Sequence, residues 1–488
     1  MQVTPVTNPY YVTYLFRDKA LGNGDVLRLK IIFTVNTDGT DITINAEDDD
    51  SIYISDPGYK ETEYGIEDFL LTPSYYSPKL SAPDDSNFIK YLFALSGTVY
   101  QNTIREAQVI LLKQENGSTT FKNEFNGNII LKSINYDPDT SYLTFEAAPD
   151  MSILSRTLLF DLDGNALDPL GYGVPDPYDP ENHPCYISLK TFLLDCYRLV
   201  NPNFIIDDLI IEHDWKFFSS LFFEGSQIYD EYDLEFQYVN LPLYPMFHAS
   251  ASGFQTLADL LKQIAKEFAS FTGINDAGEP FFKKLYNTAN PITLSSESYY
   301  SFNKSYDLNK IVYSRITSGN VGYDGGTLTQ TTYHYPSASA FTGLTDTYIE
   351  FVTILVAHNN TGSSISKYNI LYGSPTYSPY AEQRIYGVKD DSFEYNTIGE
   401  WFTNSEYPKY VPLGQLQAAF WYNHRSSYLK CRKDKIITPT DVKITDSFIF
   451  NGIQYQPLRV KRYYKDCKTE IEGSIIKSLE YDAGTPSV

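Results

Sequence analysis

The chain has 488 residues, 42% of them hydrophobic, and a formal net charge of −23. This length is enough for real cores and for about three domains, at roughly 100–200 residues each. The acidic balance excludes tight binding to nucleic acid or to an anionic membrane surface, because both require positive charge. It is compatible with solubility, or with a channel wall that repels passing DNA.

The aromatic content favours strands and interfaces. The chain holds 43 Tyr and 30 Phe, and both residue types prefer strands. Tyr is also enriched at protein interfaces, because its ring is apolar and its hydroxyl can form a hydrogen bond. Both interpretations of the Tyr content stay open at this level.

Cysteine usage and hydropathy indicate where the protein is made. The four cysteines are Cys185, Cys196, Cys431 and Cys467. None forms a CxxC pair, so we expect free thiols in a reducing cytoplasm and no disulfide framework. The N-terminal stretch has no charged region followed by an apolar one, so we expect no signal peptide. Apolar runs such as residues 351–357 are too short to span a bilayer.

Residues 1–155 are predicted to form strands and hairpins. The apolar run 27–35 leads into the turn residues 36–40 and then into the alternating stretch 41–44, which together predict a hairpin. The same turn chemistry recurs at residues 115–117, 125–128 and 136–139. Turns at this spacing predict a sandwich or barrel.

Residues 156–250 are predicted to form an inserted mixed α/β segment. Residues 161–183 are rich in Asp, Pro and Gly and are predicted to be a loop. A helix then begins after Ser188, a good N-cap, and ends at Asn201-Pro202. Its apolar stripe consists of Phe192, Leu193, Cys196, Leu199 and Val200.

Residues 251–320 contain the clearest predicted helix, over 256–269. Thr256 and Asp259 resemble a capping box, with Asp in place of the usual Glu or Gln. One continuous apolar face is formed by Leu257, Leu260, Leu261, Ile264, Ala265 and Phe268. The turn residues 275–278 follow, so the helix feeds a β-hairpin that belongs to a second barrel region.

Residues 321–410 are predicted to be a Gly/Ser/Tyr-rich insertion, and 411–488 a C-terminal helix and β-meander. The helix is expected over 415–430. Strands are expected at 435–437, 442–444, 448–450, 453–455, 458–464 and 470–479. Asn451-Gly452 is a strong hairpin signal, because both residues tolerate positive φ. The predicted fold class is therefore mainly β, a β-rich α+β protein with a few packed helices and inserted domains.

Basic charge is concentrated near the C-terminus. Residues 425–468 hold eleven Lys or Arg and four Asp or Glu. One interpretation is a solvated surface of mixed charge. The other is a basic end that docks on an acidic face of a neighbouring copy or partner, the head-to-tail pattern that closes rings.

Sequence motifs for chemistry are mostly missing. The six histidines have no HExxH spacing, and the chain lacks a GxSxG elbow, a Walker loop and a GxGxxG after a strand. The best metal candidate is the acidic segment with Asp161, Asp163, Asn165, Asp168, Asp176, Asp179 and Glu181. It fails the EF-hand spacing, because Gly164 stands at the fourth position and no Glu at the twelfth. We therefore expect no catalytic, cofactor-binding or metal-ligating residues, and no enzyme.

Four segments in chain order resemble the hub proteins of bacteriophage tails and of contractile injection machines. First, a strand led by Gly127 runs into the turn Tyr136-Asp137, and the next strand ends before Asp150. The second segment is the amphipathic helix 256–268 with the hairpin around Gly278. The third is the start of a strand at 306–312. The fourth is the closing meander 448–455 with 471–476. Residues 156–250 and 321–410 lie mostly outside the resemblance, as insertions that face partners.

This resemblance implies two barrel-like domains related to the tail-tube fold and a homotrimer with pseudo-sixfold symmetry around a channel. The implied function is structural: a virion protein at the distal end of a phage tail that joins the tail tube to the tail tip or baseplate. Its implied partners are the tail tube protein, distal tail or baseplate ring proteins, and a tail fibre or spike. DNA would pass through the channel during genome ejection without specific binding. Assembly would take place in the host cytoplasm.

Two other classes of function remain open. A receptor- or carbohydrate-binding adhesin suits aromatic-rich β domains, and monomers that bind glycans would favour it over the hub. A carbohydrate-active enzyme would use paired carboxylates, which cannot be picked out among 61 Asp and Glu. Turnover that a single carboxylate substitution abolishes would support the enzyme.

Overall fold

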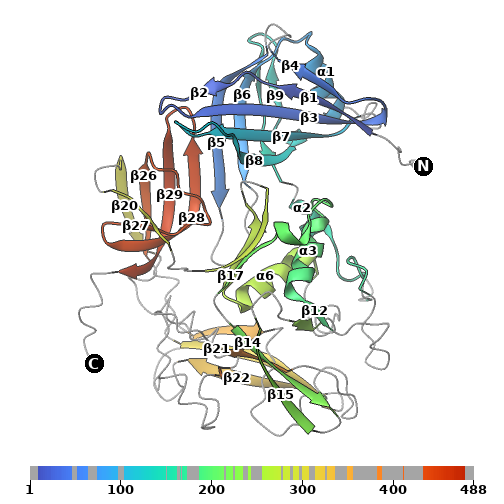
Figure 1. The fold of residues 1–488 in the computed structure, drawn as a ribbon, viewed down its shortest axis with the longest axis vertical. Coiled ribbons are helices and arrows are strands. Elements are labelled where there is room, and N and C mark those ends of the chain that lie inside the picture. The colour runs from blue at the N-terminus through green and yellow to red at the C-terminus, as the bar shows by residue number, and fades with distance from the viewer. Residues whose placement is uncertain are drawn as a thin grey trace.

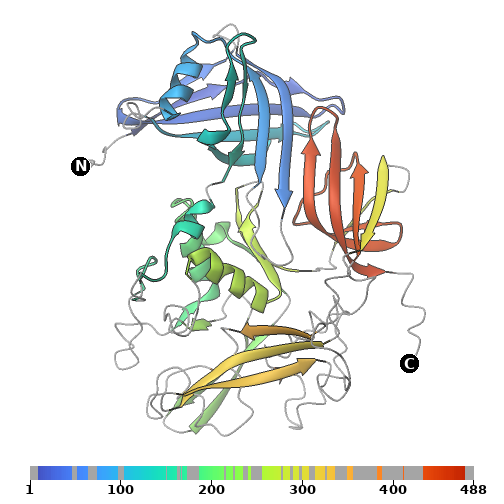
Figure 2. The same ribbon diagram turned by 180° about the vertical axis from the view of Figure 1, so that it is seen from behind.

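The computed structural model is strand-rich, as the sequence predicts, with helices in its middle part (Figures 1 and 2). It describes residues 9–46, 52–63, 74–96, 104–149, 151–161, 165, 167–172, 186–213, 216–223, 226–234, 240–242, 255–275, 278–285, 290–295, 299–306, 314–324, 327–335, 349–354, 382–386, 410–411 and 432–478. The mainly-β fold class is confirmed. None of the helices in these ranges is long and apolar enough to cross a bilayer.

The N-terminal sheet curls around one apolar core. Its first five strands, in spatial order, are β4 (Ile42–Asn45), β1 (Pro9–Leu15), β3 (Val26–Asp38), β7 (Ile104–Gln114) and β8 (Lys122–Ile129). It continues through β11 (Ala147–Ala148), β6 (Tyr75–Ser81) and β5 (Tyr53–Glu63). Short strands flank it: β2 (Lys19–Ala20), β9 (Asn135–Asp137) and β10 (Tyr142–Thr144). A 3-10 turn, η1 (Leu131–Ser133), precedes β9.

An aromatic cluster fills this sheet. Helix α1 (Asn87–Ser96) packs on the inner face and inserts Phe88, whose ring meets those of Tyr14 and Phe33 edge-on, with centroids 5.0 and 5.7 Å away. All three rings are fully buried. Ser86 starts the helix, because its Oγ accepts from the Ile89 amide at 3.3 Å. The sequence analysis did not predict this helix.

Two predicted turns differ from the structure. β3 and β4 do not form a hairpin, because β1 lies between them and pairs antiparallel with β3 and parallel with β4. The turn residues at 36–40 therefore indicate that the chain changes direction, but they do not determine which strand β4 pairs with. Residues 125–128 lie inside β8 rather than in a turn. Gly127 is needed there because a Cβ would lie 2.5 Å from the carbonyl carbon of Ala148 in the neighbouring strand.

Other predicted hairpins are confirmed. β7 turns into β8 through residues 115–117, with Gly117 at φ 82°, and β9 turns into β10 after Asp137. β27 (Phe448–Phe450) turns into β28 (Ile453–Tyr463) with Asn451 at φ 49° and Gly452 at φ 74°. Two consecutive positive φ angles are typical of a type I′ turn, which matches the twist of the strands.

The middle of the molecule is a helical unit on a small sheet. Its helices are α2 (Ser152–Arg156), α3 (Leu189–Arg198) and α6 (Leu257–Glu267). Both predicted caps are confirmed: Ser188 Oγ accepts from the Thr191 amide at 3.1 Å, and Thr256 Oγ1 accepts from the Asp259 amide at 3.2 Å. The sheet order is β13 (Ile210–Glu212), β18 (Pro280–Lys284) and β17 (Ser270–Ile274). Nearby lie η2 (Ile206–Asp208) and the pair β12 (Tyr186–Ser188) and β16 (Asn240–Pro242).

The C-terminal sheet continues the N-terminal one. From β28 it runs to β29 (Lys468–Ser478), β26 (Arg432–Thr438) and β20 (Ser301–Tyr306). β27 and β19 (Ile292–Thr293) form a branch. Residues 442–444 are not a strand, although Val442 and Ile444 are both buried. These residues form a loop whose alternating apolar side chains point into the core. The predicted helix over 415–430 lies outside the described residues.

Two further sheets use distant segments. One has the order β15 (Ser226–Leu234), β14 (Lys216–Phe223), β24 (Glu382–Tyr386) and β25 (Tyr410–Val411). The other has the order β22 (Thr327–Tyr335), β21 (Ser314–Asp324) and β23 (Ile349–Ile354). β14 and β15 thus share one sheet with the distant strands β24 and β25, and β13 shares another with β17 and β18. The division of the chain into five parts stays a prediction.

Candidate functional site

The feature that distinguishes this molecule is the joint between its two large sheets. β5 pairs with β6 along the N-terminal sheet and with β28 along the C-terminal sheet, antiparallel, with Tyr59 opposite Tyr463 and Glu63 opposite Arg459. Among the described strands, this is the pairing that links the two sheets (Figure 1). We call the charged and aromatic side chains around it the β5–β28 joint.

A glycine bulge allows β5 to serve both sheets. The register of β5 against β6 slips on either side of Asp56, and Gly58 adopts φ 68°. The Asp56 carboxylate accepts from the Gly58 amide at 2.8 Å, and the Gly58 carbonyl accepts from the Tyr464 amide at 3.1 Å. A Cβ at this position would lie 1.7 Å from the Ser77 carbonyl oxygen. No other residue type fits this backbone without a shift.

The outer face of the joint carries a charge ladder. Glu61 Oε1 accepts from Arg459 Nε at 2.6 Å, and Glu61 Oε2 lies 2.8 Å from Lys461 Nζ. Lys461 Nζ also lies 3.8 Å from the ring centroid of Tyr59. The charges continue across the sheet, where Arg459 meets Glu472 at 3.5 Å. Neighbouring strands therefore present opposite signs, which stabilises their register.

These partners shift the pKa of Glu61. Burial of the carboxyl raises its pKa, but hydrogen bonds from Lys461 and Arg459 outweigh that effect, so the pKa of Glu61 lies below its ordinary value. The ionised form is thus the one that the joint stabilises.

The inner face of the joint holds a buried ion pair. Lys60 and Glu124 are 6% and 8% exposed, and Lys60 Nζ donates to Glu124 Oε1 at 2.8 Å. Tyr464, from beyond β28, donates its hydroxyl to the same carboxylate oxygen at 3.0 Å. A buried charge without these partners would cost several kcal/mol. The trio therefore favours one seating of the C-terminal sheet on the N-terminal one.

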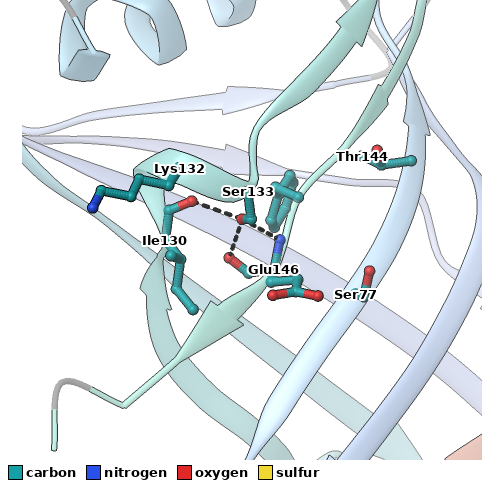
Figure 3. A pocket seen from close by; sticks show the side chains of 7 residues that line it. Ser77, Ile130, Lys132, Ser133, Thr144 and Glu146 are labelled. Carbon is teal, nitrogen blue, oxygen red and sulfur yellow. Dashed lines mark hydrogen bonds between the residues drawn. The ribbon is translucent and has the colours of Figure 1, made fainter. Parts of the chain in front are cut away.

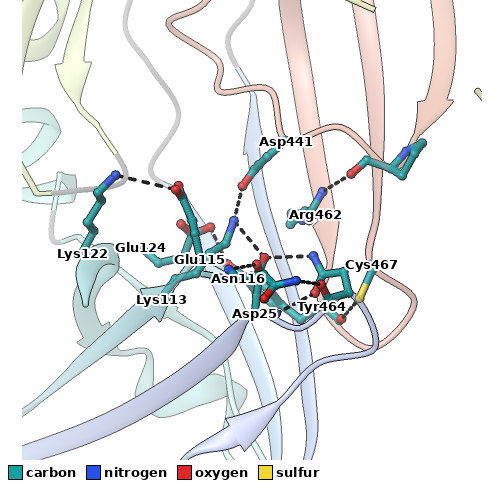
Figure 4. Close-up of polar contacts among 12 residues, drawn as sticks. Asp25, Lys113, Glu115, Asn116, Lys122, Glu124, Asp441, Arg462, Tyr464 and Cys467 are labelled. Atoms are coloured by element: carbon teal, nitrogen blue, oxygen red, sulfur yellow. Dashed lines mark hydrogen bonds and ion pairs between the residues drawn. The ribbon is translucent and has the colours of Figure 1, made fainter. Parts of the chain in front are cut away.

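A second charged cluster lies beside this pair (Figure 4). Lys113 Nζ donates to Asp441 Oδ2 at 2.6 Å and lies 3.5 Å from Asp25 Oδ2. Asp25 also accepts from the Asn116 amide at 2.9 Å. Burial raises the pKa of Asp441, but Arg462, Lys113 and Lys60 overcome this and lower the pKa to about 2. In this cluster too, an N-terminal strand and a C-terminal loop contribute side chains of opposite charge that pair with each other.

Some basic residues of the C-terminal stretch 425–468 form ion pairs and hydrogen bonds within the β5–β28 joint. Arg459 and Lys461 pair with Glu61 of the same chain, and Arg462 donates to Thr469 Oγ1 at 2.5 Å. These charges are used inside the molecule. Docking of the remaining basic surface on another copy stays a prediction.

The acidic segment forms local turns. Asp161 accepts from both the amide and the side-chain amide of Asn165, each at 2.8 Å, and Asp168 accepts from the Tyr172 amide at 3.0 Å. The remaining acidic residues of the candidate lie outside the described ranges. Within those ranges, no three His, Cys, Asp or Glu side chains are close enough together to hold a metal ion.

The residues with reactive side chains have structural partners. Two histidines, His213 and His334, lie in the described part of the chain, and His213 Nε2 lies 2.9 Å from the Phe268 carbonyl oxygen. Burial and the neighbouring Lys284 hold the pKa of His213 well below its usual value. Cys196 is a free, fully buried thiol, and burial raises its pKa. A buried protonated thiol is a poor nucleophile. Cys467 is also free; the other two cysteines lie outside the described residues.

One shallow depression lies on the N-terminal sheet (Figure 3). Its lining consists of Ser77, Ile130, Lys132, Ser133, Thr144, Phe145 and Glu146. Ser133 Oγ donates to the Ile130 carbonyl at 2.7 Å and accepts from the Glu146 amide at 2.7 Å. These bonds hold the η1 turn in place, so the Ser133 hydroxyl has a structural role.

No family model matches the chain, and no curated protein matches its sequence. Solved structures that align with this chain include three tail proteins. The 43 kDa tail protein of prophage MuSo2 from Shewanella oneidensis has 9% identity and a TM-score of 0.37, over 87% of this chain and 97% of that one. Prophage tail protein gp18 from Listeria monocytogenes EGD-e has 12% identity and a TM-score of 0.36, over 86% and 88%.

The third is the tail protein from Neisseria meningitidis MC58, with 10% identity and a TM-score of 0.37, over 87% of this chain and 95% of that one. These identities and TM-scores are low.

Proposed function

We propose that this chain is a structural component of a bacteriophage tail, and that it forms the hub that joins the tail tube to the tail tip or baseplate. It would act as a homotrimer in the virion, bind the tail tube protein, ring proteins and a fibre or spike, and line the channel for genome ejection. It would have no catalytic activity.

The single observation that carries this proposal is the β5–β28 joint. One strand belongs to both sheets, a glycine at positive φ fixes its path, and a buried ion pair and a partly buried charged cluster favour one seating. Such a joint holds two β lobes at one fixed angle. A protein that connects two other proteins in a fixed relative orientation needs such a rigid joint. A protein that binds one small ligand does not.

The charge distribution agrees with a channel role. The chain carries −23 overall, and several of its basic side chains are paired within the joint. The net negative charge that remains repels phosphate, so DNA can pass without adhering. The order of the hub-like segments along the sequence supports the same proposal.

Co-assembly with the tube protein tests the proposal. Purified chain is mixed with the tail tube protein of the same phage and imaged by electron microscopy. We expect rings with a central hole at one end of the tubes. Chain that leaves tubes uncapped, stays monomeric and is retained on a glycan array would instead support an adhesin.

A matched pair of glycine variants tests the contribution of the joint. Gly58→Ala places a Cβ against the Ser77 carbonyl, whereas Gly117→Ala, also at positive φ, meets no atom within 4 Å. We expect Gly58→Ala to lower the fraction of capped tubes strongly and Gly117→Ala to leave it close to the wild type. Equal capping by both variants would contradict a role for the fixed joint.

A further inference from the structure

The long sheet that runs through both lobes has two ends. Among the described strands, β4 pairs with β1 alone and β20 pairs with β26 alone. β4 lies at the N-terminal sheet and β20 at the outer edge of the C-terminal sheet, on the far side of the joint (Figures 1 and 2). The other outer strands of this sheet, β2, β9 and β19, have two or three residues each.

The β4 end leaves core-facing apolar surface uncovered. Ile42 is the register partner of Val12 and therefore lies on the same face of the sheet. Val12 is fully buried, yet Ile42 is 46% exposed. The difference arises because β4 is the last strand, and a further strand beside it would cover this side chain.

The β20 end carries exposed aromatic and polar residues. Tyr300 is 65% exposed and Tyr299 40% exposed, just before the strand begins. Within β20, Asn303, Lys304 and Ser305 are exposed. No other described strand pairs with the outward edge of β20. The amide and carbonyl groups of such an edge can serve as a template for another strand.

The two ends differ in charge. β20 contributes Lys304 and is backed by Lys433 of β26, whereas Lys435 of β26 is paired with Glu470 at 2.6 Å. β4 is preceded by Asp38 and by the exposed Asp41. The sequence continues with Glu47, Asp48, Asp49 and Asp50, which lie outside the described residues. Opposite charges favour approach of one end to the other and disfavour approach of two like ends.

We propose that β4 of one copy pairs with β20 of the next, so that the long sheet continues from copy to copy. The contact is heterologous, and such contacts close into rings when the rotation per copy fits. The occupant of each edge is thus a second copy of this chain. This inference rests on the proposed function and names the surface through which the hub would assemble.

Mixed cross-linking of two variants, each with one added cysteine, tests the pairing. Thr43→Cys and Asn303→Cys both replace exposed residues. A short bifunctional thiol reagent is added to each variant alone and to an equimolar mixture. We expect a cross-linked band at twice the chain mass in the mixture and none with either variant alone. Wild type and Lys90→Cys, an exposed site on α1, report the background from native thiols.

The outcomes separate this inference from the proposed function. Cross-links in either variant alone would show a contact between like ends and overturn the inference. Wild-type protein that forms rings while the mixture stays uncross-linked would overturn the inference and leave the hub proposal standing. Wild-type protein that stays monomeric at high concentration would overturn both.

Charge reversal gives a second, independent measurement. Lys304→Glu places a carboxylate at the basic end, and Lys90→Glu makes the same change at an exposed position of helix α1. We expect Lys304→Glu to weaken self-association about tenfold, which corresponds to about 1.4 kcal/mol, and Lys90→Glu to leave it unchanged. Equal effects in sedimentation experiments would overturn the inference.

Discussion

The two sheets on either side of the joint both have apolar cores, but they differ in the groups that stand out within them. The N-terminal sheet is filled by aromatic rings such as Tyr14, Phe33 and Phe88. The C-terminal sheet buries charge: Asp434 is fully buried, and accepts from Arg432 Nε at 2.7 Å and from the Tyr455 hydroxyl at 2.6 Å. Apolar burial supplies free energy without direction, whereas paired polar groups tolerate few arrangements. Apolar burial therefore contributes stability in both lobes, whereas the paired charged groups favour one seating of the C-terminal sheet on the N-terminal one.

The largest effect is expected in the aromatic core. Phe88→Ala removes a fully buried ring and should lower the free energy of unfolding by about 3–5 kcal/mol. Phe93→Ala, on the same helix but 44% exposed, should cost much less. Urea denaturation followed by fluorescence compares the two variants. Similar losses would show that the N-terminal core does not dominate stability.

The next effect concerns the buried ion pair. Glu124→Leu leaves Lys60 without its carboxylate partner and should cost about 3 kcal/mol, whereas the double variant Lys60→Met/Glu124→Leu should recover most of that loss. The same denaturation assay gives the double-mutant cycle. A double variant as unstable as Glu124→Leu would mean that the pair contributes net stability and does more than select the seating.

A smaller, pH-dependent effect is expected from Asp441. Its pKa is lowered to about 2, so its contribution is fully present above its ordinary pKa near 4 and is lost as pH falls towards 2. Since the side chain is about a third exposed, we expect about 1 kcal/mol. Unfolding midpoints measured from pH 5 to 2 should fall less steeply for Asp441→Asn than for wild type. Identical slopes would contradict this assignment.

The smallest effect belongs to the outer charge ladder. Glu61→Gln should cost roughly 0.5–1 kcal/mol at low salt, because the pair with Arg459 and Lys461 is partly solvated. The difference from wild type should shrink in 1 M salt, where charges are screened within about 3 Å. A loss that does not change with salt would indicate that packing, and not charge, accounts for the contribution of Glu61.

Local structure was predictable wherever neighbouring residues determine it. Ser188 and Thr256 cap helices as expected, and Asn451-Gly452 forms the expected turn. These features depend on φ preferences and on hydrogen bonds within a few residues. The helix α1 was missed, although Ser86 followed by Phe88, Ile89 and Leu92 carries a cap and an apolar stripe.

Pairing between distant residues was not predictable. β4 lies beside β1 rather than β3, and Gly127 serves a close strand contact rather than a turn. Lys60, Lys113 and Glu124 of the joint come from the first third of the chain, and Asp441 comes from its last tenth. The excess of basic residues after 425 was the available indication, but charge alone does not identify a partner. Only the sheet order brings these groups together.

The proposal that copies of this chain close around an axis is tested most directly by the mass of the purified protein in solution. Multi-angle light scattering over a range of concentrations should give three times the chain mass of 55.6 kDa. A mass that stays at that of one chain at the highest concentration would contradict the account.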